Sequence, residues 1–235
     1  MDFQQPGNFE HGWYRAKNKL ISYLLTGLKP ASGDWVILDI GCGPGEQLKL
    51  YEKFGRVVGL DINPGARQIN NSIITADIET YQLPANTYNL ICCFDMLEHL
   101  KNDAEVLANC WQALKPGGYL LLTTSAYNWL FSSHDKAAKH QRRYYYKELK
   151  NKLKTANFTL LQLYYWNSLL FFPIAVLRLI KKLLNWQRGY ELSYLPSWMN
   201  NFVYSCLLFE NWLIKNRCHL PWGLSLYAVA KKNEN

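Results

Sequence analysis

One stretch of the chain, SSHDKAAKHQRRYYY at residues 132–146, concentrates side chains that can take part in catalysis. It contains His134 and His140, and histidine is the side chain that most readily gains and loses a proton near neutral pH. Arg143 carries a planar cation that can bind an anionic group of a substrate, and Tyr144 follows it. The stretch therefore predicts a substrate-binding loop, and the alternative is a turn that Arg143 and Tyr144 brace against the fold.

A glycine-rich run follows the first strongly apolar segment of the chain, WVILDI at 35–40. Glycine lets the backbone turn tightly, approach a ligand closely and present its N–H groups to it. Dinucleotide-binding proteins use similar runs, so the glycines alone do not define the ligand. The glycines are Gly41, Gly43 and Gly45, with Cys42 between the first two.

Three aspartates stand near the ends of consecutive apolar segments. Asp39 precedes the glycine run, Asp61 ends the second segment and Asp77 ends the third. A carboxylate at the position of Asp61 can accept two hydrogen bonds from a ribose. Because three carboxylates surround the predicted site, a cationic cofactor suits it better than a pyrophosphate does.

The order of the predicted elements gives the fold class. Apolar segments of strand length alternate with helical patterns, which predicts an α/β fold with a parallel sheet covered on both faces. The predicted strands are 35–40, 56–61, 72–77, 88–94, 119–125, 158–165 and 223–232. The predicted helices are 12–28, 102–114 and 147–156, and KPGG at 115–118 predicts a turn.

Five motifs, taken in order, resemble those of the class I S-adenosylmethionine-dependent methyltransferases. They are VILDIGCGPG, VVGLDI, the pair Ala76-Asp77, FDMLEHL and LKPGGYLLLTT, and the similarity spans roughly residues 30–165. The opening HGWYRAKNKLI also resembles an HxWFRxR helix in a small-molecule branch of the family. The resemblance implies a Rossmann-like, doubly wound seven-stranded sheet in the order 3-2-1-4-5-7-6, with strand 7 antiparallel. It also implies S-adenosyl-L-methionine as cofactor.

The same resemblance assigns cofactor-binding roles residue by residue. The glycines wrap the methionine part, Asp39 supports the glycine loop, Asp61 binds the ribose hydroxyls, and Asp77 faces the adenine. The full set is Asp39, Gly41, Cys42, Gly43, Gly45, Asp61, Ile62, Asp77, Ile78 and Phe94.

The implied reaction is an in-line methyl transfer to an oxygen or nitrogen of a small-molecule or lipid-like acceptor. The enzyme mainly aligns the acceptor and excludes water, and a hydroxyl acceptor also needs a base, which speeds transfer by ~10²–10⁴. Related methyltransferases carry an H-x-x-R-R-Y sequence, which HQRRY at 140–144 matches in part. The catalytic candidates are His99, His134, His140, Arg143 and Tyr144, with His11 and His219 as more remote histidines.

The segment DMLEH at 95–99 allows two alternatives for its acidic residue and its histidine. In the first, Glu98 and His99 only cap the next helix. In the second, the segment resembles an ExxEH that binds a divalent metal in ubiquinone-pathway O-methyltransferases and small-RNA 2′-O-methyltransferases. Asp95 is shorter than the first glutamate of that pattern, so we expect no metal here.

The second half of the chain is strongly basic. The total net charge of +8 divides into −3 for residues 1–130 and +11 for residues 131–235, and the second part holds 20 of the 35 aromatic residues. This composition favours an anionic, partly apolar partner such as a membrane surface or a lipidic substrate. We expect no nucleic-acid partner because the basic residues interleave with an apolar helix. An RNA methyltransferase and a non-catalytic cofactor-binding module that docks a partner protein remain the alternatives.

Residues 166–222 exceed what a minimal sheet of this kind needs, and we expect them to form a helical cap inserted into a domain made of 1–165 and 223–235. The apolar part of 168–184 ends at Arg178 after ten residues, whereas a membrane span takes ~20. We expect this segment to touch a membrane surface or an apolar substrate. The alternative is a private core against Trp198, Phe202, Phe209 and Trp212.

The cysteines and the first residues bear on the compartment. The six cysteines form no CxxC pair and no zinc spacing, and the opening residues lack a basic stretch followed by an apolar one. We therefore expect a cytoplasmic protein without a signal peptide, with peripheral membrane contact through 168–184.

Overall fold

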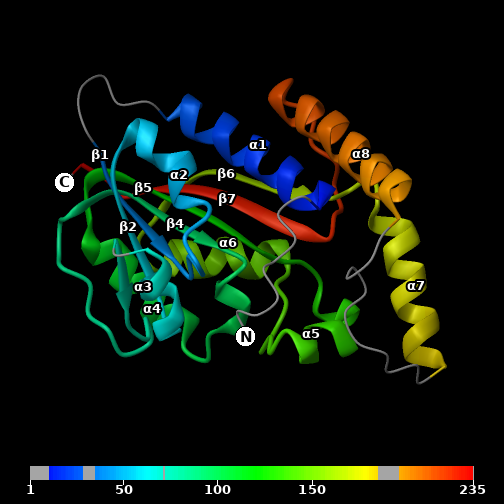
Figure 1. Cartoon of the computed structure of the whole chain (residues 1–235), viewed down its shortest axis with the longest axis horizontal. Helices are drawn as coiled ribbons and strands as arrows, with labels where there is room; N and C mark the ends of the chain where they lie inside the picture. The colour runs from blue at the N-terminus through cyan, green and yellow to red at the C-terminus, as the bar shows by residue number, and fades with distance from the viewer. Residues whose placement is uncertain (1–10, 29–34, 71, 185–195, 235) are drawn as a thin grey trace.

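The computed structural model describes residues 11–28, 35–70, 72–184 and 196–234. Its centre is a 7-stranded sheet in the order β3-β2-β1-β4-β5-β7-β6 (Figure 1). The strands are β1 Trp35–Ile40, β2 Gly55–Asp61, β3 Ile73–Thr75, β4 Tyr88–Phe94, β5 Leu114–Ser125, β6 Thr159–Trp166 and β7 Ser225–Lys231. The predicted strands and their predicted order are confirmed.

The direction of the strands places the candidate loops at one edge. β1 pairs in parallel with β2 and β4, and β4 pairs in parallel with β5, whereas β7 runs antiparallel between β5 and β6. Central parallel strands need apolar side chains on both faces, and β1 is buried at five of its six positions. The carboxyl ends of β1, β2, β4 and β5 consequently share one edge of the sheet, where ligands bind in folds of this kind.

The predicted turn at 115–118 is wrong, because β5 already begins at Leu114. The backbone there bends without leaving the sheet, and Gly117 takes φ +77°, a conformation that glycine adopts without strain. The end of β7 pairs with this bend. The Gly117 N–H donates to the Lys232 carbonyl at 3.0 Å, and the Lys232 N–H donates to the Gly118 carbonyl at 2.9 Å. Residues 115–118 therefore belong to β5, although their sequence is typical of a turn, because they pair with the end of a strand far along the chain.

Helices cover both faces of the sheet, as the alternation of side chains along β1 requires. The α-helices are α1 Gly12–Gly27, α2 Leu48–Tyr51, α3 Pro64–Ile69, α4 Asp103–Ala113, α5 Ser133–Ala137, α6 Tyr146–Thr155, α7 Phe171–Leu183 and α8 Ser197–Lys215. Trp35 and Ile37 belong to a buried cluster closed by α1, α2 and α8, whereas Leu38 and Ile40 belong to a second cluster closed by α4 and α6. The 3-10 helices are Glu52–Phe54, Leu97–His99 and Asn128–Leu130.

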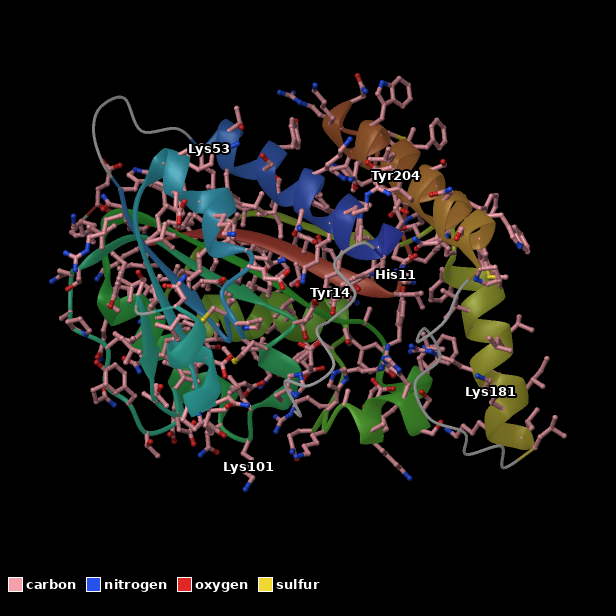
Figure 2. The ribbon with its side chains drawn as sticks, viewed as in Figure 1. His11, Tyr14, Lys53, Lys101, Lys181 and Tyr204 are labelled. Carbon is pink, nitrogen blue, oxygen red and sulfur yellow. The ribbon has the colours of Figure 1, made fainter. Side chains whose placement is uncertain are left out.

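α1 and α8 lie side by side over one face of the sheet, although they are far apart in the sequence (Figure 1). Gly12 permits this approach, because a Cβ atom there would lie 2.5 Å from the Asn200 carbonyl oxygen. The Gly12 N–H donates to the side-chain oxygen of Asn200 at 2.7 Å. The Arg15 guanidinium lies 4.1 Å from the ring centre of Tyr204, which Figure 2 labels on α8. α1 and α8 therefore form one layer on this face of the sheet.

α7 and α8 are the helices of the segment between β6 and β7. α7 lies at one end of the molecule (Figure 1) and is attached by Phe171 and Ala175, which pack with Leu130 and Leu224. The alternative of a private core is wrong, since the outer aromatic residues of α8 are exposed. Their exposed fractions are 70% for Trp198, 59% for Phe202, 54% for Phe209 and 57% for Trp212. No described helix combines the length and the apolar character needed to cross a bilayer.

Candidate active site

The glycine loop leaves the carboxyl end of β1 and turns toward α2. Gly41, Gly43 and Gly45 have φ values of +75°, +54° and +83°, which L side chains rarely adopt. Space is also limiting at Gly41, where a Cβ atom would lie 2.8 Å from Cγ of Met96. The Gly41 N–H donates to the carbonyl oxygen of Leu60 at 2.7 Å, which fastens the loop to β2. The sequence needs glycine here for both conformation and space.

Asp61 ends β2 and holds the glycine loop from the other side. Its carboxylate accepts the N–H of Gly43 at 2.8 Å and the N–H of Asn63 at 2.9 Å. An ionised carboxylate has about four lone-pair positions, so Asp61 keeps capacity for further donors. The next residue, Ile62, is apolar but 66% exposed. The end of β2 thus offers a carboxylate next to an uncovered apolar side chain.

Asp39 lies in β1, just before the glycine loop, and is buried with 2% exposure. Its Oδ2 atom has no hydrogen-bond partner among the described residues. Burial raises the pKa of Asp39 to about 7, the charge of Lys17 lowers it, and the nearby carboxylate of Asp61 raises it further. A buried carboxyl group in this condition favours the approach of a cation.

The remaining residues of the predicted cofactor set lie around this edge but do not all meet. The Asp77 carboxylate accepts the N–H of Glu79 at 3.0 Å. Ile78 and Phe94 are both buried, and they belong to the two different core clusters, on opposite faces of the sheet. Burial, followed by the charges of Asp39 and Asp61, raises the pKa of the Cys42 thiol, which therefore stays neutral. The structure places Cys42 in the glycine loop with its thiol uncharged.

Asp95 follows β4 and takes φ +50°, which is uncommon for a residue with a side chain. Its carboxylate accepts a hydrogen bond from the Thr123 hydroxyl at 2.8 Å and forms an ion pair with the ammonium of Lys17 on α1. Burial alone would raise the pKa of Asp95, but the charge and hydrogen bond of Lys17 bring it below its ordinary value. Lys17 was not among the site residues predicted from the sequence.

Glu98 is buried beneath the same edge. Its carboxylate accepts hydrogen bonds from the hydroxyl of Thr124 at 2.8 Å and from the hydroxyl of Ser125 at 2.9 Å. Burial, and then the charge of Asp95, raises the pKa of Glu98. The interpretation of Glu98 as a cap of the next helix is wrong, because α4 begins at Asp103 and the carboxylate binds the end of β5 instead.

Two of the candidate histidines meet in the structure. The rings of His99 and His140 lie edge to face with their centres 4.7 Å apart. Burial, and then the positive charge that His140 can carry, lowers the pKa of His99, so His99 is neutral at physiological pH. His134 lies on the short helix α5 and is not part of this ring contact. The histidine pair therefore joins the end of β4 to the loop 132–146.

Asp135, which was not among the residues predicted from the sequence, organises that loop. It is fully buried, and its Oδ1 atom lies 2.9 Å from Nδ1 of His140 and 2.7 Å from the donating Nε of Arg143. Its Oδ2 atom accepts the N–H of Ser132 at 2.8 Å. Burial alone would raise the pKa of Asp135, but the bond with His140 and the charge of Arg143 bring it below its ordinary value. The carboxylate is therefore ionised and holds the ring of His140 in one orientation.

Arg143 and Tyr144 direct their polar groups into the protein. Arg143 is 4% exposed and also donates through Nη1 to the carbonyl of Ala126 at 3.1 Å. The hydroxyl of Tyr144, which is fully buried, donates to the Asp103 carboxylate at 2.6 Å. The half-buried Arg142 donates to the carbonyl of Lys101 at 2.9 Å. Arg143 and Tyr144 are thus placed as expected if they brace the loop 132–146 against the rest of the fold.

The more remote histidines have contacts of their own. His11 is the N-cap of α1, where Figure 2 labels it, and its Nδ1 accepts the N–H of Trp13 at 3.2 Å. His219 stacks on Tyr164 with ring centres 4.9 Å apart. In the part of the chain that the structure describes, no group of three or more His, Cys, Asp and Glu side chains is arranged to hold a metal ion.

Comparison with known proteins decides the family. The family model described as "Methyltransferase domain" matches residues 9–163, which include the glycine loop, Asp61, the histidine pair and Asp135. The chain belongs to the S-adenosylmethionine-dependent methyltransferase family. For this methyltransferase domain, the resemblance of the ordered motifs and the expected sheet are confirmed.

The methyltransferase domain is similar to curated ubiquinone biosynthesis O-methyltransferases. It is 30% identical to that of Coxiella burnetii over 99 residues, which cover 37% of this chain and 42% of the relative. It is 32% identical to that of Burkholderia lata over 145 residues, which cover 52% of this chain and 62% of the relative. The chain thus spans less than two thirds of the length of these relatives.

Solved methyltransferase structures share the fold. A sarcosine dimethylglycine methyltransferase from Galdieria sulphuraria superimposes with a TM-score of 0.62 at 15% identity, covering 94% of this chain and 87% of the other. An S-adenosylmethionine-dependent methyltransferase from Mesorhizobium loti gives 0.61 at 16% identity, covering 92% and 99%. Phosphoethanolamine N-methyltransferase 2 from Haemonchus contortus, in complex with S-adenosyl-L-methionine, gives 0.58 at 17% identity, covering 99% and 59%.

The residues at this edge fit the family's cofactor, S-adenosyl-L-methionine. Its sulfonium and ammonium groups are cationic, and the buried Asp39 has an oxygen without a partner among the described residues. Its ribose carries hydroxyl donors, and Asp61 has acceptor capacity left. Its adenine is a flat apolar ring, and Ile62 offers an exposed apolar surface beside Asp61.

Proposed function

We propose that this chain transfers the methyl group of S-adenosyl-L-methionine to a hydroxyl oxygen of a small-molecule or lipid-like acceptor. The observation that carries the proposal is the contact between Asp135 and Nδ1 of His140 at 2.9 Å, which orients a histidine ring against His99 at the carboxyl edge of the sheet. An oxygen acceptor needs a base, whereas an amine can act without one. The similarity to ubiquinone biosynthesis O-methyltransferases supports the same choice.

We propose that three groups of residues bind the three parts of the cofactor. The glycine loop and Asp39 bind the methionine part, Asp61 and Ile62 bind the ribose and one side of the adenine, and Asp77 and Ile78 bind its other side. Phe94 contributes to the floor from the end of β4. When bound, the cofactor supplies an electrophilic methyl group on a sulfonium.

His140 is the proposed base. The ionised Asp135 accepts the proton on Nδ1 of His140, so Nε2 is left with a lone pair that can accept the proton of an acceptor hydroxyl. Arg143 forms an ion pair with Asp135 at 2.7 Å and balances the charge of the carboxylate that orients the imidazole. In the transfer, the acceptor hydroxyl would give its proton to Nε2 of His140 as its oxygen takes the methyl group, and the electron pair of the carbon–sulfur bond would remain with the cofactor's sulfur.

The other candidates support this step. His99 is neutral and packs its ring against His140, which limits the orientations open to the base. Arg143 and Tyr144 act as positioning residues, because the former neutralises Asp135 and the latter ties the loop to α4 through Asp103. We further propose that residues 166–222 form a helical cap on a methyltransferase domain made of 1–165 and 223–235.

The test uses cofactor with a radiolabelled methyl group and a panel of phenols, aliphatic alcohols, isoprenoid lipids, amines and bulk RNA. We expect label in an oxygen-linked product, with turnover falling ~10²–10⁴-fold in His140→Ala and with little change in cofactor affinity. His219→Ala is the matched control and should keep full turnover. Label in an amine or RNA, or full activity of His140→Ala on the true acceptor, would contradict the proposal. Cofactor binding without any product across the panel would favour a non-catalytic module.

A further inference from the structure

The outer side of α8 carries a stripe of large aromatic residues. Trp198, Phe202, Phe209 and Trp212 follow one another at intervals of four, seven and three residues, which places them on one side of a helix. All four are more than half exposed. Phe209 and Trp212 stack on each other with ring centres 5.8 Å apart, so part of the stripe is already ordered.

The opposite side of α8 is firmly packed, so the orientation of the stripe is fixed. Leu207 and Ile214 are buried in the cluster that α1 closes. The Asn211 side chain accepts from Nε1 of Trp166 at 2.9 Å and donates to the Ala16 carbonyl at 2.9 Å. Because this side already provides the core contacts of α8, the aromatic stripe is additional to the core. A surface helix ordinarily carries polar residues at such positions.

α7, like α8, has a buried inner side and an exposed apolar outer side. Its inner residues Phe171 and Ala175 are buried, and its outer apolar residues recur at the helical spacing on the other side. These outer residues are Phe172, Val176, Leu179, Ile180 and Leu183, with exposed fractions between 41% and 82%. We call the outer apolar residues of α7 and α8 together the α7–α8 apolar surface. Groups of exposed large apolar side chains of this kind are typical of interaction sites.

The exposed charges on α7 and α8 themselves have one sign. α7 contains no acidic residue, and the only acidic residue of α8 is Glu210. Glu210 is 2% exposed, and its carboxylate accepts the backbone N–H of Ser168 at 2.9 Å on the inner side. Exposed cations, in contrast, end both helices, at Lys182 and Lys215. The excess of positive charge is not confined to the two helices, because residues 131–235 together carry a net charge of +11.

We propose that the α7–α8 apolar surface docks on the surface of an anionic lipid bilayer. Tryptophan and other aromatic side chains settle at the boundary between lipid headgroups and acyl chains, and lysines beside them attract anionic headgroups. The charge pattern favours a bilayer over a second copy of the chain, because two copies of the surface facing each other would bring cations against cations. Neither helix crosses the bilayer, and the attachment is peripheral.

The test is co-sedimentation with vesicles of phosphatidylglycerol and phosphatidylcholine, compared with vesicles of phosphatidylcholine alone. We expect binding to the anionic vesicles at low salt, weaker binding at high salt, and far less binding to the neutral ones. Trp198→Ser/Trp212→Ser should reduce the partition coefficient at least ~tenfold, because two large apolar side chains no longer enter the lipid. Leu161→Ser, which changes an apolar residue of β6 that is 47% exposed, is the control and should bind like the wild type.

A second measurement covers the case in which the double variant folds poorly. Brominated phosphatidylglycerol should quench part of the tryptophan fluorescence of the wild type, and the conservative Trp198→Phe should lose a share of that quenching. Wild-type protein that stays in the supernatant with anionic vesicles at low salt overturns the proposal. So does a dimer, detected by sedimentation equilibrium, that Trp198→Ser/Trp212→Ser dissociates, because a second copy would then cover this surface.

Discussion

The ammonium of Lys17 on α1 and the carboxylate of Asp95 at the end of β4 form an ion pair beneath the candidate active site. The Lys17 side chain is 4% exposed, and its ammonium also lies 5.1 Å and 5.4 Å from the ring centres of Trp13 and Phe94. The carboxylate is held from its other side by the hydroxyl of Thr123. A helix outside the sheet is thus tied by charge to the strand end where the acceptor is expected.

Replacing Lys17 with methionine should destabilise the fold by about 1–3 kcal/mol near neutral pH, because the Asp95 carboxylate would lose its charged partner. The pair lowers the pKa of Asp95, so its contribution is complete above the unfolded pKa of about 4 and is lost as the pH falls through the folded value. The difference from wild type in urea unfolding should therefore shrink in acid. Lys101→Met, at an exposed lysine that Figure 2 labels, should show no such difference.

A second prediction concerns the buried Asp39, whose pKa burial raises to about 7. A carboxyl group with a raised pKa destabilises the folded state progressively as the pH rises from its unfolded value, about 4, to its folded value. Asp39→Asn removes the titration and should make the cofactor-free protein more stable at pH 8, by up to a few kcal/mol. At pH 4 the same variant should gain nothing. A gain of equal size at both pH values in urea unfolding would mean that another effect of the substitution dominates.

The same carboxyl group gives a prediction for cofactor binding. The cationic cofactor should favour the ionised form of Asp39, so binding near pH 7 should release protons from the wild type. Titration calorimetry in two buffers of different ionisation enthalpy measures this release. Asp39→Asn should bind more weakly and without the buffer-dependent heat. Equal proton release by the variant would assign the titration to another group.

A further prediction tests the end of β2. Asp61→Ala should weaken cofactor binding by ~1.5–3 kcal/mol for each charge-assisted hydrogen bond lost. The variant also removes the acceptor of the Gly43 N–H, so Asp61→Asn serves as the comparison that keeps one oxygen in place. We expect the order wild type, Asp61→Asn, Asp61→Ala in affinity by calorimetry. Unchanged affinity of the alanine variant would remove Asp61 from the cofactor site.

The sheet was predictable because each strand can be recognised from its own residues. The segments 35–40 and 88–94 are apolar except for Asp39 and Asn89, as expected of strands buried on both faces, and the glycines that follow the first of them permit the turn. The turn predicted at 115–118 failed for the opposite reason. Its glycines are a local signal, but the pairing with Lys232 that keeps it in β5 joins residues far apart in the chain.

The candidate site was only partly predictable. His140 was predicted from the sequence and Asp135 was not, although Ser132 and Asp135 have the spacing of a helix capping box that the structure contains. The capping-box spacing predicts that the Asp135 carboxylate is ordered, but it does not predict the contact with His140. The pair of Lys17 with Asp95 left no local signal at all, because it depends on how α1 crosses the end of β4.

Asp135 is the residue on which the proposed chemistry can be tested most sharply. Asp135→Asn keeps the shape of the side chain but removes the charge that fixes the proton on Nδ1 of His140, so turnover should fall toward that of His140→Ala. Cofactor affinity should change little, since Asp135 lies in the loop 132–146 and not in the glycine loop. The measurements are kcat and the calorimetric affinity of each variant.

A merely structural role for Asp135 would give another pattern, and the double variant separates the two. If Asp135 acts through His140, then Asp135→Asn should cause little further loss of turnover in a His140→Ala background, because the group that it orients is already absent. If it only braces the loop, through Arg143 and Ser132, the losses of the two single variants should multiply. Arg143→Lys, which keeps a cation beside Asp135, should retain more of the wild-type stability than Arg143→Ala, because the alanine variant leaves a buried carboxylate unbalanced. Losses that multiply in the double variant would make the Asp135–His140 contact a structural brace.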